Sequence, residues 1–156
     1  MAAEKNPSSP LASMKGHHVG LRVPDLDAAL TWYSEKLDFR LTASTEAAGL
    51  TWAFLAPADD DSFLIELAAG PGAVDRPEWG ELTDMLDLHG WHHVCLWVDD
   101  LDHTIAELIS RDVAVVAGPL DYEELGQRAA FVADPWGNLF ELLEDLDETQ
   151  GALAGA

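Results

Sequence analysis

The chain of 156 residues contains a single cysteine, Cys95, so no disulfide can form within it. A chain without disulfides suits a reducing compartment such as the cytosol. It has no run of about 18 consecutive apolar residues, which argues against a transmembrane helix. The N-terminal residues also lack the apolar segment of a secretory signal. We therefore expect a cytoplasmic protein that does not enter a membrane.

Basic residues are scarce as well. Eight Lys and Arg residues stand against 29 Asp and Glu residues, which gives a formal net charge of −21. Such a surface repels nucleic acids and anionic membranes, so neither class of partner is expected. Apolar residues make up 48% of the chain, enough to build a packed core. The composition thus indicates a folded, well-solvated protein and leaves its substrate open.

Two pairs of matching motifs indicate an internal duplication. HHVGLRVPDLDAAL begins at His17 and HHVCLWVDDLDHTI begins at His92, an offset of 75 residues. AFLAPADDDSFLIELAA begins at Ala53 and finds its counterpart AFVADPWGNLFELLE at Ala130. Because both motifs recur in the same order at nearly the same separation, chance is a poor explanation. The sequence predicts two related modules between loose ends: an arm (1–15), module one (16–70), a linker (71–90), module two (91–144) and a tail (145–156).

Each module shows the pattern of one strand, one helix and three strands. A short β-branched strand is followed by an aspartate that can cap a helix, and apolar residues then recur at helical spacing. Turn-forming residues separate the strands that follow. The fold class is therefore α+β, with a βαβββ unit given twice. The strands after each helix are expected at 38–45, 50–56 and 62–68, and at 112–117, 127–133 and 138–144.

Four polar side chains share the strand faces that point away from the helices. Strand side chains alternate between faces, and by this alternation His18 and Glu66 oppose the apolar rows of the first module. His93 and Glu141 do the same in the second module, again 48 positions apart. Two carboxylates in one cavity would repel each other, and a divalent cation removes that cost. Two imidazoles and two carboxylates suit Zn, Ni, Co, Mn or Fe(II). We therefore predict one metal ion held by these four residues.

The motifs HHVGLRVPDLDAALTWYSEKL, FLIEL, GWHHVCLWVDDLD and AFVADPWGNLFELLE resemble the vicinal oxygen chelate superfamily. This superfamily includes glyoxalase I, methylmalonyl-CoA epimerase, bleomycin resistance proteins and extradiol dioxygenases. The resemblance implies paired βαβββ modules that form a cupped, barrel-like mixed sheet around a metal. Its ligand positions match His18, Glu66, His93 and Glu141, as in bacterial glyoxalase I. Glu66 departs from the epimerases, which usually carry Gln there, and the glutathione-contacting segments are not recognisable.

The resemblance also implies a reaction class. A substrate with metal-chelating oxygens would lose a proton next to a carbonyl, and the metal would stabilise the enolate. Glu141 and Glu66 are the candidate bases, which predicts an isomerase, epimerase or lyase. One alternative is an Fe(II) extradiol-type dioxygenase built on His18, His93 and Glu141, with Glu66 as the argument against it. The other is a non-catalytic small-molecule binding or resistance protein. A homodimer is expected by analogy.

Further inward-facing residues complete the prediction. Arg22 either binds a carboxylate or phosphate of the substrate or pairs with a cavity glutamate. Trp97 either offers a flat apolar wall to the substrate or simply fills the barrel. Cys95 lies on the face of His93, where a strand cysteine without a placed base is ordinary apolar filling. Glu46 aligns loosely with the base of the epimerases, but its surroundings are typical of a solvated turn.

Overall fold

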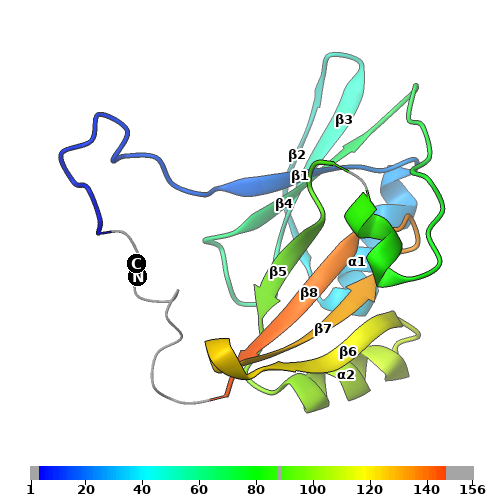
Figure 1. Cartoon of the computed structure of the whole chain (residues 1–156). Helices are drawn as coiled ribbons and strands as arrows, with labels where there is room; N and C mark the ends of the chain where they lie inside the picture. Colours follow the sequence, from blue (N-terminus) through cyan, green and yellow to red (C-terminus); the bar gives the residue numbers. More distant parts are fainter. Residues whose placement is uncertain (1–3, 88, 147–156) are drawn as a thin grey trace.

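The computed structural model describes residues 4–87 and 89–146, and it contains the βαβββ pattern twice (Figure 1). A short 3-10 helix in the linker, η1 (Leu82–Asp87), separates the two modules. In the second module a single 3-10 turn, η2 (Glu123–Leu125), lies between the second and third strands. The α+β prediction is confirmed. The first module consists of β1 (His18–Arg22), α1 (Leu26–Leu37), β2 (Arg40–Ala47), β3 (Leu50–Ala56) and β4 (Leu64–Ala69), and the second of β5 (His93–Trp97), α2 (Leu101–Ser110), β6 (Ala114–Tyr122), β7 (Gln127–Ala133) and β8 (Leu139–Asp145).

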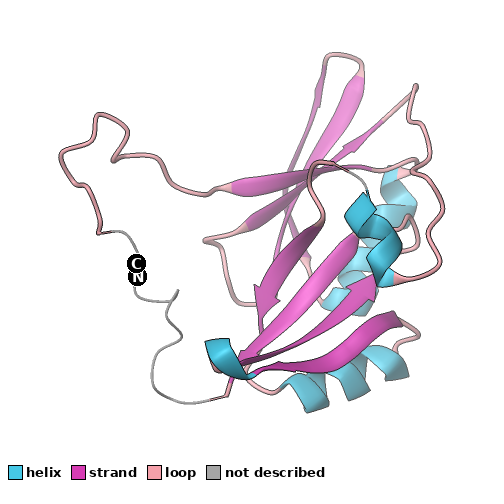
Figure 2. Ribbon diagram, in the orientation of Figure 1, coloured by secondary structure: helices cyan, strands magenta, loops and turns pink. Residues whose placement is uncertain are grey.

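The strands form two separate mixed sheets with identical topology. The strand order is β1-β4-β3-β2 in the first sheet and β5-β8-β7-β6 in the second. In each sheet the first strand of the module pairs in parallel with the last, and the other neighbours are antiparallel. Figure 2 shows the two sheets as distinct layers with helices beside them. Within the described residues the chain therefore builds two sheets, and the single cupped sheet around a metal is not formed.

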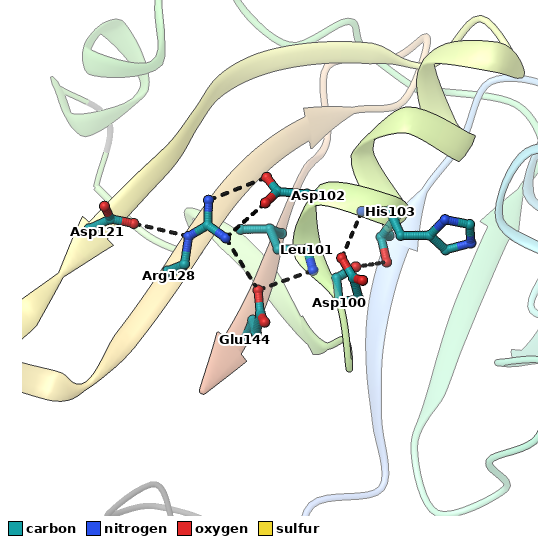
Figure 3. A network of polar contacts seen from close by, with 8 residues as sticks. Asp100, Leu101, Asp102, His103, Asp121, Arg128 and Glu144 are labelled. Carbon is teal, nitrogen blue, oxygen red and sulfur yellow. Dashed lines mark hydrogen bonds and ion pairs between the residues drawn. The ribbon is translucent and has the colours of Figure 1, made fainter. Parts of the chain in front are cut away.

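Capped helices give each module its shape. The side chain of Asp25 accepts a hydrogen bond from the backbone N–H of Ala28, and Asp100 does the same for His103. At the start of α2, Glu144 accepts a hydrogen bond from the Leu101 N–H and lies 3.7 Å from the Arg128 guanidinium (Figure 3). Arg128 also contacts Asp102 and Asp121, so this network ties α2 to β6, β7 and β8 of the second sheet.

One core joins the two modules. Tyr33 on α1 is fully buried, and its ring packs against Phe140 and Trp136 of the second module. Its hydroxyl donates a 2.7 Å hydrogen bond to Asp134, which lies in the turn between β7 and β8. The buried residues of both sheets belong to the same cluster, so the two modules share a continuous core. The opposite faces of β1 and β5, which carry the predicted ligands, are exposed.

The two ends of the chain differ in what can be described. Residues 4–15 of the predicted arm form turns without a helix or strand and extend away from the two sheets (Figure 1). The predicted tail, 145–156, lies outside the described residues from position 147 onward. None of the helices in the described part of the chain is long and apolar enough to cross a membrane.

Candidate metal centre

His18 and Glu66 form a pair on the exposed face of the first sheet. Parallel pairing of β1 with β4 places Gly20 opposite Glu66. His18 is two residues before Gly20 on β1, so its side chain lies on the same face of the sheet. The His18 Nε2 atom is 3.6 Å from a Glu66 carboxylate oxygen. Phe54 of β3 meets the imidazole edge to face, with ring centroids 5.6 Å apart. We call His18 with Glu66 the first half-site.

The second sheet repeats this arrangement with His93 and Glu141, which we call the second half-site. Here β5 pairs with β8 and Cys95 lies opposite Glu141. The His93 Nε2 atom is 3.1 Å from a Glu141 carboxylate oxygen. Phe131 takes the place of Phe54, with ring centroids 5.5 Å apart. The repeat in the sequence is therefore also a repeat of one polar pair on one aromatic support.

A second histidine orients the ligand histidine in each half-site. The Nδ1 atoms of His17 and His18 are 2.8 Å apart, and so are those of His92 and His93. Because Nδ1 is engaged in this way, Nε2 is the nitrogen presented to the glutamate. An outer partner on one ring nitrogen commonly fixes a metal-binding histidine through the other.

The spacing within each half-site is compatible with a shared metal ion. Two ligand atoms about 2.1 Å from one ion stand roughly 3.0–3.4 Å apart, depending on the coordination geometry. The Nε2–carboxylate distances of 3.6 and 3.1 Å lie near this range. The donors, one imidazole and one carboxylate per sheet, also suit a borderline divalent cation. However, no group of three or more His, Cys, Asp or Glu residues able to hold a metal occurs in the described part of one chain. Each sheet thus carries half of the predicted ligand set.

Cys95 distinguishes the second half-site from the first. Partial burial of the thiol, the charge of Glu141 and a hydrogen bond to that carboxylate raise the pKa of Cys95 to about 12. A thiol with such a pKa is protonated at neutral pH and is a poor nucleophile. The equivalent position in the first half-site is Gly20, where an added Cβ would lie 3.5 Å from the Glu66 carboxylate. The two half-sites therefore share the His–Glu pair but differ in the residue beside the carboxylate.

The structure gives the other predicted residues more ordinary surroundings. The Arg22 guanidinium donates to the backbone carbonyls of Val23, Ala68, Gly70 and Pro71, not to a cavity glutamate. It thus fixes the end of β4, and a role in substrate binding stays a prediction. Trp97 is 51% exposed on the face of His93, so it does not fill a closed barrel in one chain. Glu46 is exposed on β2, close to the turn at Ala48 and Gly49.

Sequence reasoning missed Arg76 in the linker. This residue lines the same hollow as His18 and His93, and its guanidinium donates to the Asn138 side chain. Because basic residues are rare in this chain, the presence of an arginine in the linker was the one signal that could have drawn attention to it. Nothing in the linker sequence predicts which surface that arginine approaches.

Comparison with known proteins identifies the family. The profile described as Glyoxalase/Bleomycin resistance protein/Dioxygenase superfamily matches residues 15–142, most of the chain. The chain belongs to this superfamily. The predicted resemblance is thereby confirmed, and the paired modules and the two half-sites are to be read as those of a member of the glyoxalase/bleomycin resistance/dioxygenase superfamily.

Individual relatives in this superfamily are distant. A probable lactoylglutathione lyase from Synechocystis is 30% identical over 131 residues, covering 81% of this chain and 92% of the relative. A probable chloroplastic lactoylglutathione lyase from Arabidopsis thaliana is 32% identical over 130 residues, also 81% of this chain. The chain spans about a third (35%) of the Arabidopsis protein. Among solved structures, the antibiotic-binding protein TnmS3 from Streptomyces sp. CB03234 is similar in fold, with a TM-score of 0.62 and 24% identity over 86% of this chain and 98% of that one.

Proposed function

We propose that this protein is a metal-dependent lyase or isomerase of the glyoxalase type, acting on a small molecule with metal-chelating oxygens. The observation that carries the proposal is the pair of matching half-sites, each with an oriented histidine and a carboxylate 3.1–3.6 Å away. The distant likeness to two probable lactoylglutathione lyases supports the reaction class. The ion is a divalent Zn, Ni, Co, Mn or Fe.

We further propose that a second copy of the chain completes the centre. Within one chain the two half-sites belong to different sheets, and His18 and His93 lie on exposed faces of β1 and β5. Neither supplies more than one imidazole and one carboxylate, whereas a catalytic zinc-type site commonly has three or more protein ligands. In a two-fold symmetric dimer, the first half-site of one copy can meet the second half-site of the other, and the reverse contact follows by symmetry.

The residues of the centre would then have distinct roles. His18 and His93 hold the ion through Nε2, because His17 and His92 occupy their Nδ1 atoms. The bound metal would supply a Lewis acid that stabilises the negative charge on the substrate oxygen during proton loss. Glu141 or Glu66 accepts the proton from carbon and returns it to the neighbouring carbon. Phe54 and Phe131 pack against the imidazoles and help to exclude water from this face.

The second candidate function is non-catalytic binding of a small molecule. The fold similarity to an antibiotic-binding protein favours this candidate, because the same paired modules can enclose a ligand without chemistry. The two candidates differ in one respect that can be measured. A binding protein does not need the His–Glu pairs to hold a metal.

Metal analysis of complementary variants tests both the ligands and the dimer. We expect about one divalent ion per chain in the purified protein, and loss of that ion in His18→Ala and in His93→Ala. Co-expression of the two variants with random pairing should restore about a quarter of the wild-type metal, since half of the dimers regain one intact centre. His103→Ala, an exposed histidine on α2, is the matched control and should keep its metal.

The outcomes separate the alternatives. A mixture of the two variants that stays free of metal, although each keeps its dimeric state, would contradict assembly between copies. Stoichiometric Fe(II) in the wild type would favour an extradiol-type dioxygenase. A folded protein that neither contains metal nor takes up added metal would reject the enzyme and leave the binding protein.

A further inference from the structure

A hollow of about 610 Å³ lies at the seam between the two modules. All of β1 lines one side, the start of β5 lines another, and the linker closes a third. Its wall includes the ligand histidines of both half-sites together with Arg76 and Trp91. Trp91 and the neighbouring Val74 are each 89% exposed, so an apolar rim surrounds the opening. This volume suits a small molecule of metabolite size.

A relay of hydrogen bonds holds Arg76 at this hollow. The Arg76 guanidinium donates to the Asn138 side-chain oxygen at 3.1 Å. The Asn138 amide nitrogen donates in turn to Asp134 at 2.7 Å, which fixes the orientation of the amide. Asp134 also accepts the hydroxyl of Tyr33 from the core. Because Asn138 and Asp134 are buried, Arg76 is anchored to the rigid part of the second module.

The charge of Arg76 has no carboxylate partner. Among the residues that the structure describes, none of its nitrogens lies within 4.0 Å of an Asp or Glu oxygen, whereas Arg40, Arg111 and Arg128 all form such pairs. Arg22, which lines the same hollow, donates to backbone carbonyls and likewise keeps its charge. In a chain with 29 acidic and eight basic residues, two arginines without a carboxylate partner on one wall are available to an anion.

A buried polar atom lies on the same wall. The Nε2 atom of His92 is shielded from solvent and has no hydrogen-bond partner among the described residues. The other ring nitrogen of His92 contacts His93, which belongs to the second half-site.

We propose that Arg76 binds an anionic group of the substrate, so that the metal centre containing His93 acts on a small carboxylate or phosphate compound. The inference rests on the proposed function for the reacting end of the substrate, but the anion contact itself does not need a metal. A planar guanidinium with free donors matches both carboxylate and phosphate oxygens. Trp91 and Val74 would cover the apolar part of the same molecule.

The test is anion binding to the full-length, chelator-treated protein, measured by calorimetric titration with succinate and, separately, with inorganic phosphate. We expect saturable binding of at least one of the two anions by the wild type. Arg76→Met should weaken that binding by about tenfold or more, because the charge-assisted hydrogen bonds are lost. The affinity of Arg76→Lys should lie between those of the wild type and Arg76→Met, because lysine keeps the charge without the planar guanidinium. Arg40→Met is the matched control, since Arg40 is already paired with Asp61 at 2.7 Å, and it should bind like the wild type.

The two anions decide the chemical class of the ligand. Saturation by succinate alone assigns a carboxylate substrate, and saturation by phosphate alone assigns a phosphate ester. No binding of either anion, or binding that Arg76→Met leaves unchanged, overturns the proposal. Metal content is measured on the same samples before chelation. A wild type that holds metal without binding anions rejects the inference alone, and one that binds anions without ever holding metal rejects the proposed function alone.

Discussion

The hydrogen bond between Tyr33 and Asp134 predicts a defined loss of stability when it is removed. Tyr33→Phe deletes one hydroxyl from a fully buried ring and leaves the packing against Phe140 in place. Because the partner is a buried carboxylate at 2.7 Å, the cost should be about 1.5–3 kcal/mol. For a domain of this size, that corresponds to a fall of roughly 3–12 °C in Tm. Denaturant unfolding of the metal-free protein measures the free energy of unfolding. The control is Tyr122→Phe at the end of β6, which should change this free energy by less than about 0.5 kcal/mol.

The same pair predicts how stability depends on pH. Burial, and then the nearby Asp134 carboxylate, raise the pKa of Tyr33 far above its ordinary value of 10.0. Because the pKa is higher in the folded state, folding favours the neutral phenol. This contribution to stability is complete below pH 10, the pKa of the unfolded tyrosine, and is lost as the pH rises above it. There the unfolded tyrosine ionises while the folded one does not, and stability falls by about 1.4 kcal/mol per pH unit. Tyr33→Phe should remove this part of the slope. A variant that unfolds with the wild-type free energy, or whose pH profile runs parallel to that of the wild type from pH 9 to 11.5, would refute the argument.

Two further predictions concern the second module. Asp100→Ala removes the side-chain cap of α2 and should lower the free energy of unfolding by about 1 kcal/mol. Asp75→Ala in the exposed linker is the control and should change the free energy of unfolding very little. Equal effects of the two variants would show that the lost charge, and not the cap, matters. In metal-free protein, alkylation of Cys95 by iodoacetamide should be slow at pH 8 and still rising at pH 11, because the pKa of the thiol is about 12. Glu141→Gln removes the charge that raises this pKa and should speed the reaction at pH 8, and an unchanged rate would contradict the assigned cause.

Much of the fold could be predicted because it follows from periodicity. Apolar spacing placed α1, and turn residues bracketed β3 and β7, which the structure confirms at 50–56 and 127–133. Other details depended on local geometry. Asp38 adopts a left-handed conformation after α1, so β2 begins at Arg40, two residues later than predicted. β6 continues to Tyr122 through Gly118 and Pro119, which favour turns, and two register shifts accommodate them. Ile109 follows the apolar spacing of α2 and is nevertheless 57% exposed.

The candidate site could be predicted only in part, for a physical reason. Alternation along β1 and β8 correctly places His18 and Glu141 on exposed or partly exposed faces, since that alternation is local. How the two modules pack is set by long-range contacts such as Tyr33 with Phe140, which no repeat encodes. For the same reason, the approach of Arg76 to the half-sites could not be seen in the sequence.

Each module contains a complete half-site, and this has an evolutionary consequence. A gene encoding one βαβββ unit would have supplied one histidine and one glutamate, so two copies of that short protein would carry all four residue types of the proposed centre. Duplication and fusion freed each half to change separately. The present chain records that divergence, with glycine beside one carboxylate and cysteine beside the other. If the proposed centre exists, selection on one half can alter what it accepts while the other half preserves its His–Glu pair.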